Sequence, residues 1–152
     1  MIGALARWLD RLRGRAGAGG SAALGRRAES LAASQLRRQR YRILARNLRV
    51  RFGEVDLLAE APDGRTVVII EVKALTGSGR NARGGPLGAM PETPEMHVDM
   101  RKQRKIAAVA VHVLRRHRLT NRPVRFDVVA IELAPGGEPV VRHHQGAFES
   151  PW

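Results

Sequence analysis

Glu71 and Lys73, which flank Val72 directly after the apolar run 67–70, are the residues of this chain best suited to chemistry. Because side chains alternate along a β-strand, both would project from the same side of a sheet. A neighbouring strand could bring the carboxylate of Asp56 beside them. Two carboxylates and an ammonium can hold a divalent cation and a water aimed at a phosphate group. The sequence therefore predicts a metal-assisted catalytic site built from Asp56, Glu71 and Lys73.

Lysine is rare in this chain, and its rarity gives Lys73 extra weight. Only Lys73, Lys102 and Lys105 occur, and every other basic residue that is not histidine is arginine. Arginine presents a rigid planar fork, whereas lysine presents a compact point-charge amine on a flexible stem. The retained lysine suggests that position 73 uses a small, positionable amine.

The composition indicates one domain with a basic surface. A chain of 152 residues with 43% hydrophobic residues can fill a single core. Its formal net charge of +13 favours a polyanionic partner, with nucleic acid ahead of an anionic membrane. The alternative is an arginine-rich, well-solvated surface without such a partner. Aromatic residues make up only 4%, which argues against a platform that stacks single-stranded bases.

Several protein classes are excluded by what the sequence lacks. The absence of cysteine excludes disulfides, thiolate zinc sites and a cysteine nucleophile. No apolar run approaches the roughly 20 residues of a membrane span, and residues 1–15 lack the apolar centre of a secretory signal. We therefore expect a cytoplasmic protein without a membrane partner. Residues 1–20 are expected to form a flexible basic arm and linker, and residues 21–152 a single domain.

The polar and apolar patterning predicts an α/β or α+β domain with a mixed sheet. Helices are expected at 21–40 and 99–118, and strands at 41–49, 54–60, 66–75, 124–133 and 139–143. Turn residues between the first three strands favour an antiparallel meander, and the Gly- and Pro-rich stretch 76–98 predicts a functional or disordered loop. His143 and His144 are adjacent and lack further ligands at zinc spacing, so they are expected at the surface.

Two helical residues have both a plain interpretation and a functional one. Glu29 lies at the edge of the apolar face of the first expected helix, where small neighbours would let it approach a sheet. It could equally be a surface glutamate beside an arginine. Lys102 lies in line with the apolar stripe of the second helix, where it either extends its amine to solvent or reaches into a site.

The motifs occur in a recognisable order. They are Gly25-x-x-x-Glu29-x-x-Ala32, Tyr41–Arg49, Gly53–Leu58, Ile70–Lys73, Lys102–Arg104 and Arg125–Val129. In this order they resemble the YraN family of small bacterial proteins, which is assigned to the restriction-endonuclease-like PD-(D/E)xK fold. The resemblance covers about Leu24 to Phe148. It implies an α/β (α+β) fold shared with restriction enzymes and archaeal Holliday-junction resolvases, with a central mixed sheet flanked by helices.

The resemblance also implies roles for individual residues. Asp56 and Glu71 would be metal ligands, and Lys73 would orient or activate the attacking water. Glu29 would match the helix acid that supplements the metal site in resolvase-like members. Oxygen donors of this kind, together with the backbone carbonyl of Val72, suit Mg²⁺ or Mn²⁺.

The expected function is that of a metal-dependent nuclease acting on phosphodiester bonds in DNA, including branched DNA. Lys102, Gln103, Arg49 and Arg51 are the candidate nucleic-acid contacts. The alternative is a non-catalytic nucleic-acid-binding protein on the same fold, since members of this fold exist without catalysis. The choices between DNA and RNA and between monomer and dimer stay open. The chain departs from the family pattern at Leu75, where an arginine is usual, and in its longer 76–98 loop.

Overall fold

The computed structural model describes residues 20–51, 53–76 and 100–148. Its elements are α2 (Gly20–Arg38), β1 (Arg42–Val50), β2 (Gly53–Glu60), β3 (Val67–Thr76), α3 (Met100–Arg116), β4 (Val124–Leu133) and β5 (Val140–Phe148). Every expected element is present, although β5 extends five residues beyond the expected end at His143. The arm expected at residues 1–19 and the loop expected at residues 77–98 lie outside the described residues.

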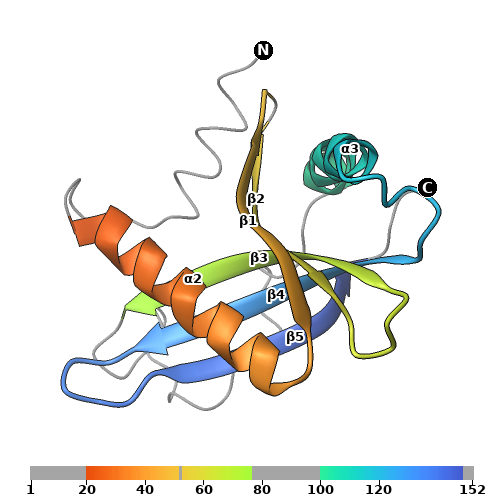
Figure 1. Cartoon of the computed structure of the whole chain (residues 1–152). Coiled ribbons are helices and arrows are strands. Elements are labelled where there is room, and N and C mark those ends of the chain that lie inside the picture. The colour runs from red at the N-terminus through yellow and green to blue at the C-terminus, as the bar shows by residue number, and fades with distance from the viewer. Residues whose placement is uncertain (1–19, 52, 77–99, 149–152) are drawn as a thin grey trace.

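The five strands form one mixed sheet in the order β1-β2-β3-β4-β5 (Figure 1). The first three strands are the expected antiparallel meander, β3 and β4 run parallel, and β5 pairs antiparallel with β4. Parallel neighbours need a crossover connection, and α3 lies in the connection between β3 and β4. The predicted fold class is confirmed: this is an α+β arrangement consistent with a restriction-endonuclease-like fold.

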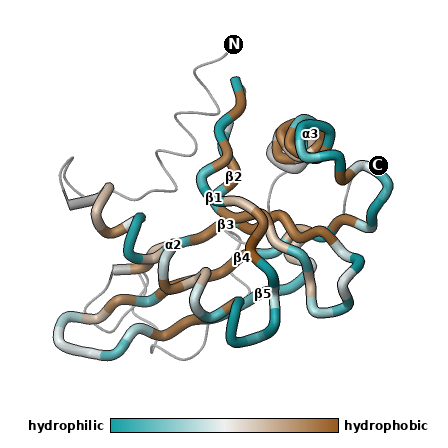
Figure 2. The backbone as a smooth tube through the Cα atoms, in the orientation of Figure 1, coloured by the Kyte–Doolittle hydropathy of each residue, from teal (hydrophilic) through white to brown (hydrophobic). Residues whose placement is uncertain are grey.

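Two hydrophobic clusters cover the two faces of the sheet, which explains the continuous apolar run in β3. Val68 and Ile70 pack in the cluster that contains α2, whereas Val67 and Ile69 pack in the cluster that contains α3. A strand buried on both faces has no need of polar alternation. Figure 2 shows the hydrophobic stretches concentrated in the strands and α3, and hydrophilic residues in the connecting turns.

The strands β2 and β3 separate halfway along their length. Their ladder runs only from Leu57 opposite Ile70 to Glu60 opposite Val67. Beyond it β2 stays paired with β1 as far as Gly53, and this two-stranded ribbon rises from the sheet (Figure 1). Val55 would share a face with Leu57 in a flat strand, yet the two pack in different clusters. The strand therefore twists at Asp56, which lies between them.

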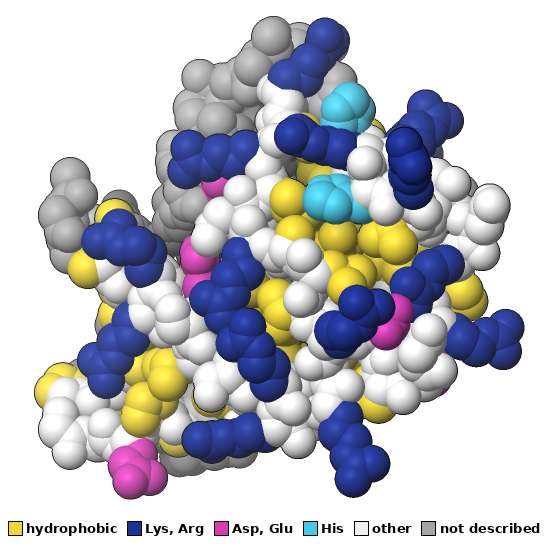
Figure 3. Space-filling view, in the orientation of Figure 1, with side chains coloured by type: hydrophobic (Ala, Val, Ile, Leu, Met, Phe, Trp, Pro, Cys, Tyr) yellow, Lys and Arg dark blue, Asp and Glu magenta, His cyan; other side chains and the backbone are white. Residues whose placement is uncertain are grey.

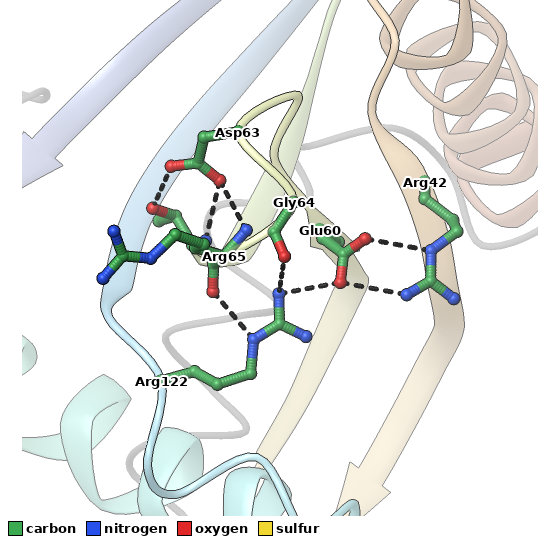
Figure 4. A network of polar contacts seen from close by, with 7 residues as sticks. Arg42, Glu60, Asp63, Gly64, Arg65 and Arg122 are labelled. Atoms are coloured by element: carbon green, nitrogen blue, oxygen red, sulfur yellow. Dashed lines mark hydrogen bonds and ion pairs between the residues drawn. The ribbon is translucent and has the colours of Figure 1, made fainter.

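The other end of β2 is fixed by a polar network at the turn to β3 (Figure 4). Asp63 accepts hydrogen bonds from the backbone N–H groups of Arg65 and Thr66 and from the Thr66 hydroxyl, which lower its pKa to about 2. Arg122 donates to the carbonyls of Arg65 and Gly64 and forms an ion pair with Glu60. Arg42 closes the network with a bidentate contact to Glu60. The β2–β3 turn, β1 and the segment that leads into β4 are thus held together, away from the point where β2 and β3 separate.

Candidate active site

Asp56 lies at the point where β2 leaves β3, and its side chain replaces the missing ladder bond. Its Oδ2 accepts a hydrogen bond of 2.8 Å from the backbone N–H of Val72. The ladder register, continued by one step, would place Asp56 opposite Glu71. The structure therefore brings the first predicted acid to the backbone between the two other predicted site residues, Glu71 and Lys73.

The Asp56 carboxyl is unusually hard to ionise. Burial is the largest cause, and the negative charges of Glu71, Glu29 and Glu54 add to it. The hydrogen bond from Val72 acts in the opposite direction but is outweighed, so the pKa of Asp56 rises to about 7. In a partly buried carboxyl surrounded by like charges, the ionised form is unfavourable, and a bound divalent cation would stabilise it. Perturbed groups of this kind are enriched at functional sites.

Glu71 and Lys73 project from the sheet face opposite α2. Val72 and Ala74, which alternate with them, pack against the cluster that contains α2. Both Glu71 and Lys73 are half-buried. The Lys73 side chain makes no hydrogen bond or ion pair with any residue in the described part of the chain. Its amine is therefore available to a ligand.

Glu29 approaches from α2, as expected. It is half-buried in the middle of the helix and close enough for its charge to raise the pKa of Asp56. Within residues 20–51, 53–76 and 100–148, however, no three or more acidic or histidine side chains form a group that could hold a metal ion. Glu29 thus contributes negative charge near Asp56. The positions of Glu29, Asp56 and Glu71 do not allow all three to coordinate one metal ion.

The donors that remain suit a hard cation of the magnesium kind. Magnesium commonly binds through one or two carboxylates, several waters and substrate phosphate oxygens, and needs no complete protein cage. Asp56 and Glu71 could supply carboxylate oxygens, and Val72 could supply a backbone carbonyl. These donor types are the ones that Mg²⁺ and Mn²⁺ prefer.

The predicted nucleic-acid contacts divide into two groups. Arg49 and Arg51 lie at the outer end of the β1–β2 ribbon and are exposed, and the Arg49 side chain is 80% accessible despite an ion pair of 3.5 Å with Glu54. Lys102 and Gln103 belong to the first turn of α3, but their side chains lie outside the described residues. Figure 3 shows basic side chains spread over the visible face, with few acidic ones among them.

Asp127 is the centre of a buried polar cluster that was not predicted from the sequence. Both oxygens of its fully buried carboxylate are bonded to Arg125, at 2.8 Å each. Arg125 also donates to the hydroxyl of Tyr41 at 2.7 Å, and the backbone N–H of Gly146 donates to Asp127 at 3.0 Å. Burial would raise the pKa of Asp127, but hydrogen bonds from His143, Arg125 and Gly146 lower it below the ordinary value.

The surface position expected for His143 and His144 is wrong. The His143 side chain is 5% accessible, its Nε2 lies 2.7 Å from Asp127, and its Nδ1 lies 3.0 Å from the amide oxygen of Gln39. His144 has a buried Nε2. Both histidines belong to the longer β5, which pairs with β4. One signal in the sequence could have indicated that Asp127 needs buried hydrogen-bond partners such as His143. Arg125 and Asp127 lie two residues apart in an apolar strand, so their side chains share a face and need polar partners there.

Fold and register together define a small α+β protein in which the predicted site residues Asp56, Glu71 and Lys73 lie near the point where two strands separate. The sequence pattern of Uncharacterised protein family UPF0102 matches residues 28–131. A UPF0102 protein of Pelobacter propionicus is 41% identical over 125 residues, which cover 82% of this chain and 81% of the relative. UPF0102 proteins of Geobacter metallireducens and Rhodococcus opacus are each 40% identical over 126 residues, covering 83% of this chain and 92% and 96% of theirs. The chain belongs to the UPF0102 family, in agreement with its resemblance to YraN proteins.

None of the helices described, which lie within residues 20–38 and 100–116, is long and apolar enough to cross a membrane.

Proposed function

We propose that this protein is a divalent-metal-dependent nuclease that hydrolyses phosphodiester bonds in DNA. The observation that carries the proposal is the 2.8 Å hydrogen bond from the Val72 N–H to Asp56. It brings one carboxylate to the backbone between Glu71 and Lys73, at the separation of β2 and β3. Restriction-endonuclease-like nucleases, which the motif order resembles, use two acids and a lysine in this relation.

Each residue has a distinct part in this proposal. Asp56 and Glu71 would hold Mg²⁺ or Mn²⁺ with the carbonyl of Val72. The ion, when bound, neutralises charge on the phosphate and lowers the cost of forming the nucleophile. Lys73 would orient the attacking water and stabilise the nucleophile that forms from it. Glu29 adds negative charge that favours the cation.

The charge of the chain supports a nucleic-acid substrate. A net charge of +13 provides long-range attraction for a polyanion, and Arg49 and Arg51 extend from the ribbon whose base carries Asp56. Lys102 and Gln103 are the proposed contacts on α3. Linear and branched DNA are both candidate substrates for this arrangement.

A non-catalytic nucleic-acid-binding protein is the second candidate. It is favoured by the absence of a three-ligand metal group among the described residues and by the structural hydrogen bond that Asp56 already accepts. In this alternative, Asp56 fastens the two strands and the arginines bind phosphates.

Cleavage assays separate the two candidates. Labelled linear duplex, four-way-junction DNA, single-stranded DNA and RNA are incubated with the protein in EDTA, Mg²⁺ or Mn²⁺. Metal-dependent cleavage by wild type that disappears in Asp56→Asn and Glu71→Gln supports the nuclease. Glu138→Gln, which removes a carboxylate from an exposed turn, is the matched control and should cleave as wild type does. Binding without cleavage of any substrate in either metal supports the alternative.

A further inference from the structure

The outward-facing side of α2 carries four arginines and no exposed acid. The helix covers one face of the sheet, and its buried residues Ala28, Ala32 and Leu36 pack in the cluster on that face (Figure 1). The exposed polar residues on the other side of α2 are Arg26, Arg27, Ser30, Ser34, Arg37 and Arg38. We call these six residues the outer face of α2. Figure 3, seen from the same direction as Figure 1, shows basic side chains over this helix.

The arginines form two pairs, one at each end of the outer face. The pairs 26–27 and 37–38 are eleven positions apart (37 − 26), which corresponds to about three helical turns or about 16 Å. Because the separation is close to a whole number of turns, both pairs point in nearly the same direction. The small side chains of Ser30 and Ser34 lie between them and leave room for an elongated ligand. Arginine and serine side chains are both common donors to the phosphate oxygens of DNA.

The four guanidinium groups of the outer face have no carboxylate beside them. None of these arginine side chains makes an ion pair or hydrogen bond with another residue in the described part of the chain. Glu29, three residues from Arg26, is half-buried and forms no ion pair with it. The exposed acids of the described chain are Asp63 and Glu138, and both lie in turns between strands. The outer face is therefore a positive surface without opposing charge, which attracts polyanions.

Two plain roles could also account for arginines on a helix surface. Basic residues stabilise the last turn of a helix, where the free carbonyl groups concentrate partial negative charge. Arg37 and Arg38 lie in that turn, whereas the other pair lies in the first half of α2, beyond the reach of this effect. The second plain role is solubility, which needs surface charge but not at particular positions. A comparison with arginines elsewhere on the protein separates these roles from ligand binding.

We propose that the outer face of α2 binds the sugar–phosphate backbone of duplex DNA. A duplex is stiff and carries about one phosphate charge per 1.7 Å of its axis, so it presents phosphates to both arginine pairs at once. Glu71 and Lys73 project from the opposite face of the sheet, so DNA on α2 is a second segment, separate from the one at the candidate active site. The nature of the ligand rests on the proposed function, whereas the surface itself rests on the exposed arginines that lack a partner.

Another polyanionic surface, an anionic membrane, suits this helix less well. A helix that binds at a membrane surface buries its apolar side in the lipid. The apolar side of α2 is already packed in the core against the sheet, and only charged and small polar residues remain on the outer face. Attraction to lipid headgroups would therefore lack the apolar contribution that holds such helices at a membrane.

The test compares α2 with a matched arginine pair on α3. That helix also ends in two adjacent exposed arginines, so Arg115→Gln/Arg116→Gln changes the net charge and the last helical turn in the same way as Arg37→Gln/Arg38→Gln. Fluorescence anisotropy of labelled duplex DNA is recorded in EDTA over a series of salt concentrations. The α2 variant should bind several-fold more weakly and reduce the slope of log affinity against log salt by about 1.8, the contribution of two phosphate contacts. The α3 variant should keep a slope near wild type.

The first arginine pair gives a second, independent comparison. Arg26→Gln/Arg27→Gln should reduce the slope by a similar amount, although the helix dipole gives this pair no role. Circular dichroism checks folding; if Arg37→Gln/Arg38→Gln does not fold, the first pair decides by the same comparison with α3. Equal slopes for the α2 and α3 variants, or no binding of duplex DNA by wild type, would overturn the proposal.

Two further outcomes separate this proposal from its alternatives. Sedimentation with vesicles that contain phosphatidylserine tests the membrane. Vesicle binding that is lost in the α2 variants, while their DNA binding matches the α3 control, would assign the outer face to a membrane and overturn the proposal. Because the anisotropy assay contains no metal, wild type that binds duplex DNA through α2 but never cleaves DNA would refute the nuclease proposal and leave this one standing.

Discussion

The carboxylate of Asp56 and the backbone N–H of Val72 are 2.8 Å apart, one step beyond the last residue pair that joins β2 to β3. A strand that leaves its neighbour exposes backbone groups that need new partners. Here the new partner is an acid, and the amide it binds lies between Glu71 and Lys73. This hydrogen bond lies directly beyond the end of the β2–β3 ladder and holds Asp56 against the backbone of the candidate site.

The raised pKa of Asp56 makes the stability of the metal-free protein depend on pH. In the unfolded chain this carboxyl has its ordinary pKa of about 3.8, whereas in the folded protein its pKa is raised to about 7. The folded state thus binds the extra proton, and Asp56 costs stability progressively as the pH rises from about 4 to about 7. At higher pH the cost is constant, with an upper limit of about 4 kcal/mol.

Asp56→Asn should remove this dependence, because an amide oxygen still accepts the Val72 hydrogen bond and carries no charge. Urea unfolding in EDTA should show the variant more stable than wild type at pH 8 and equal to it at pH 4. Asp63→Asn is the control of opposite sign, since the pKa of Asp63 is lowered to about 2 and its loss should destabilise at neutral pH. Parallel pH profiles of wild type and Asp56→Asn would contradict the assignment.

Divalent cations should stabilise the protein through the same carboxylates. A ligand that binds only the folded state raises the unfolding temperature, by an amount that grows with its concentration. We expect Mg²⁺ or Mn²⁺ to raise the midpoint for wild type at pH 8, and to do so far less for Asp56→Asn and Glu71→Gln. Glu138→Gln should respond as wild type does. An equal metal response in all four proteins would place the cation elsewhere.

The sequence predicted the fold better than it predicted the polar interior. The apolar run 67–70 identified β3, because a strand covered on both faces is continuously hydrophobic. Asp56, Glu71 and Lys73 were predicted as site residues from residue type and strand parity, and their role stays a prediction. The twist of β2 at Asp56 could not be predicted from residue type and alternation, because it depends on Val55 and Leu57 packing in different hydrophobic clusters. His143 was misjudged for a related reason: its partner Asp127 is sixteen residues away and reaches it only after β4 and β5 pair.

The Asp127 cluster should contribute stability without contributing to binding. Removing one partner of a buried ion pair leaves the other charge uncompensated and typically costs about 3–5 kcal/mol. We expect Asp127→Asn to lose about this much in urea unfolding, because Arg125 then lacks its carboxylate. Tyr41→Phe removes only the hydroxyl that accepts from Arg125 and should cost about 1 kcal/mol. DNA affinity of the folded variants should match wild type; a large loss of affinity would give the cluster a direct role in binding.

DNA binding should depend steeply on salt and survive loss of the site acids. The net charge of +13 acts through phosphate neutralisation, which releases counterions. Anisotropy measurements in EDTA should show affinity falling steeply between low and moderate salt, and Asp56→Ala and Glu71→Ala should bind at least as well as wild type because repulsion is relieved. Affinity that is flat across this range would indicate a partner recognised without electrostatics.

Lys73→Arg tests whether the site needs an amine or only a positive charge. In the described part of the chain Lys73 has no ion-pair partner, so its charge is not required to balance a neighbour. Arginine keeps the charge but brings a larger planar fork that cannot readily lose a proton. If the amine positions the attacking water, Lys73→Arg should lose most of the metal-dependent cleavage rate while DNA affinity and unfolding temperature stay near wild type. Lys73→Ala, measured beside it on linear and four-way-junction DNA, should be no more active. Cleavage by Lys73→Arg at the wild-type rate would show that charge alone suffices and would refute the role assigned to the amine.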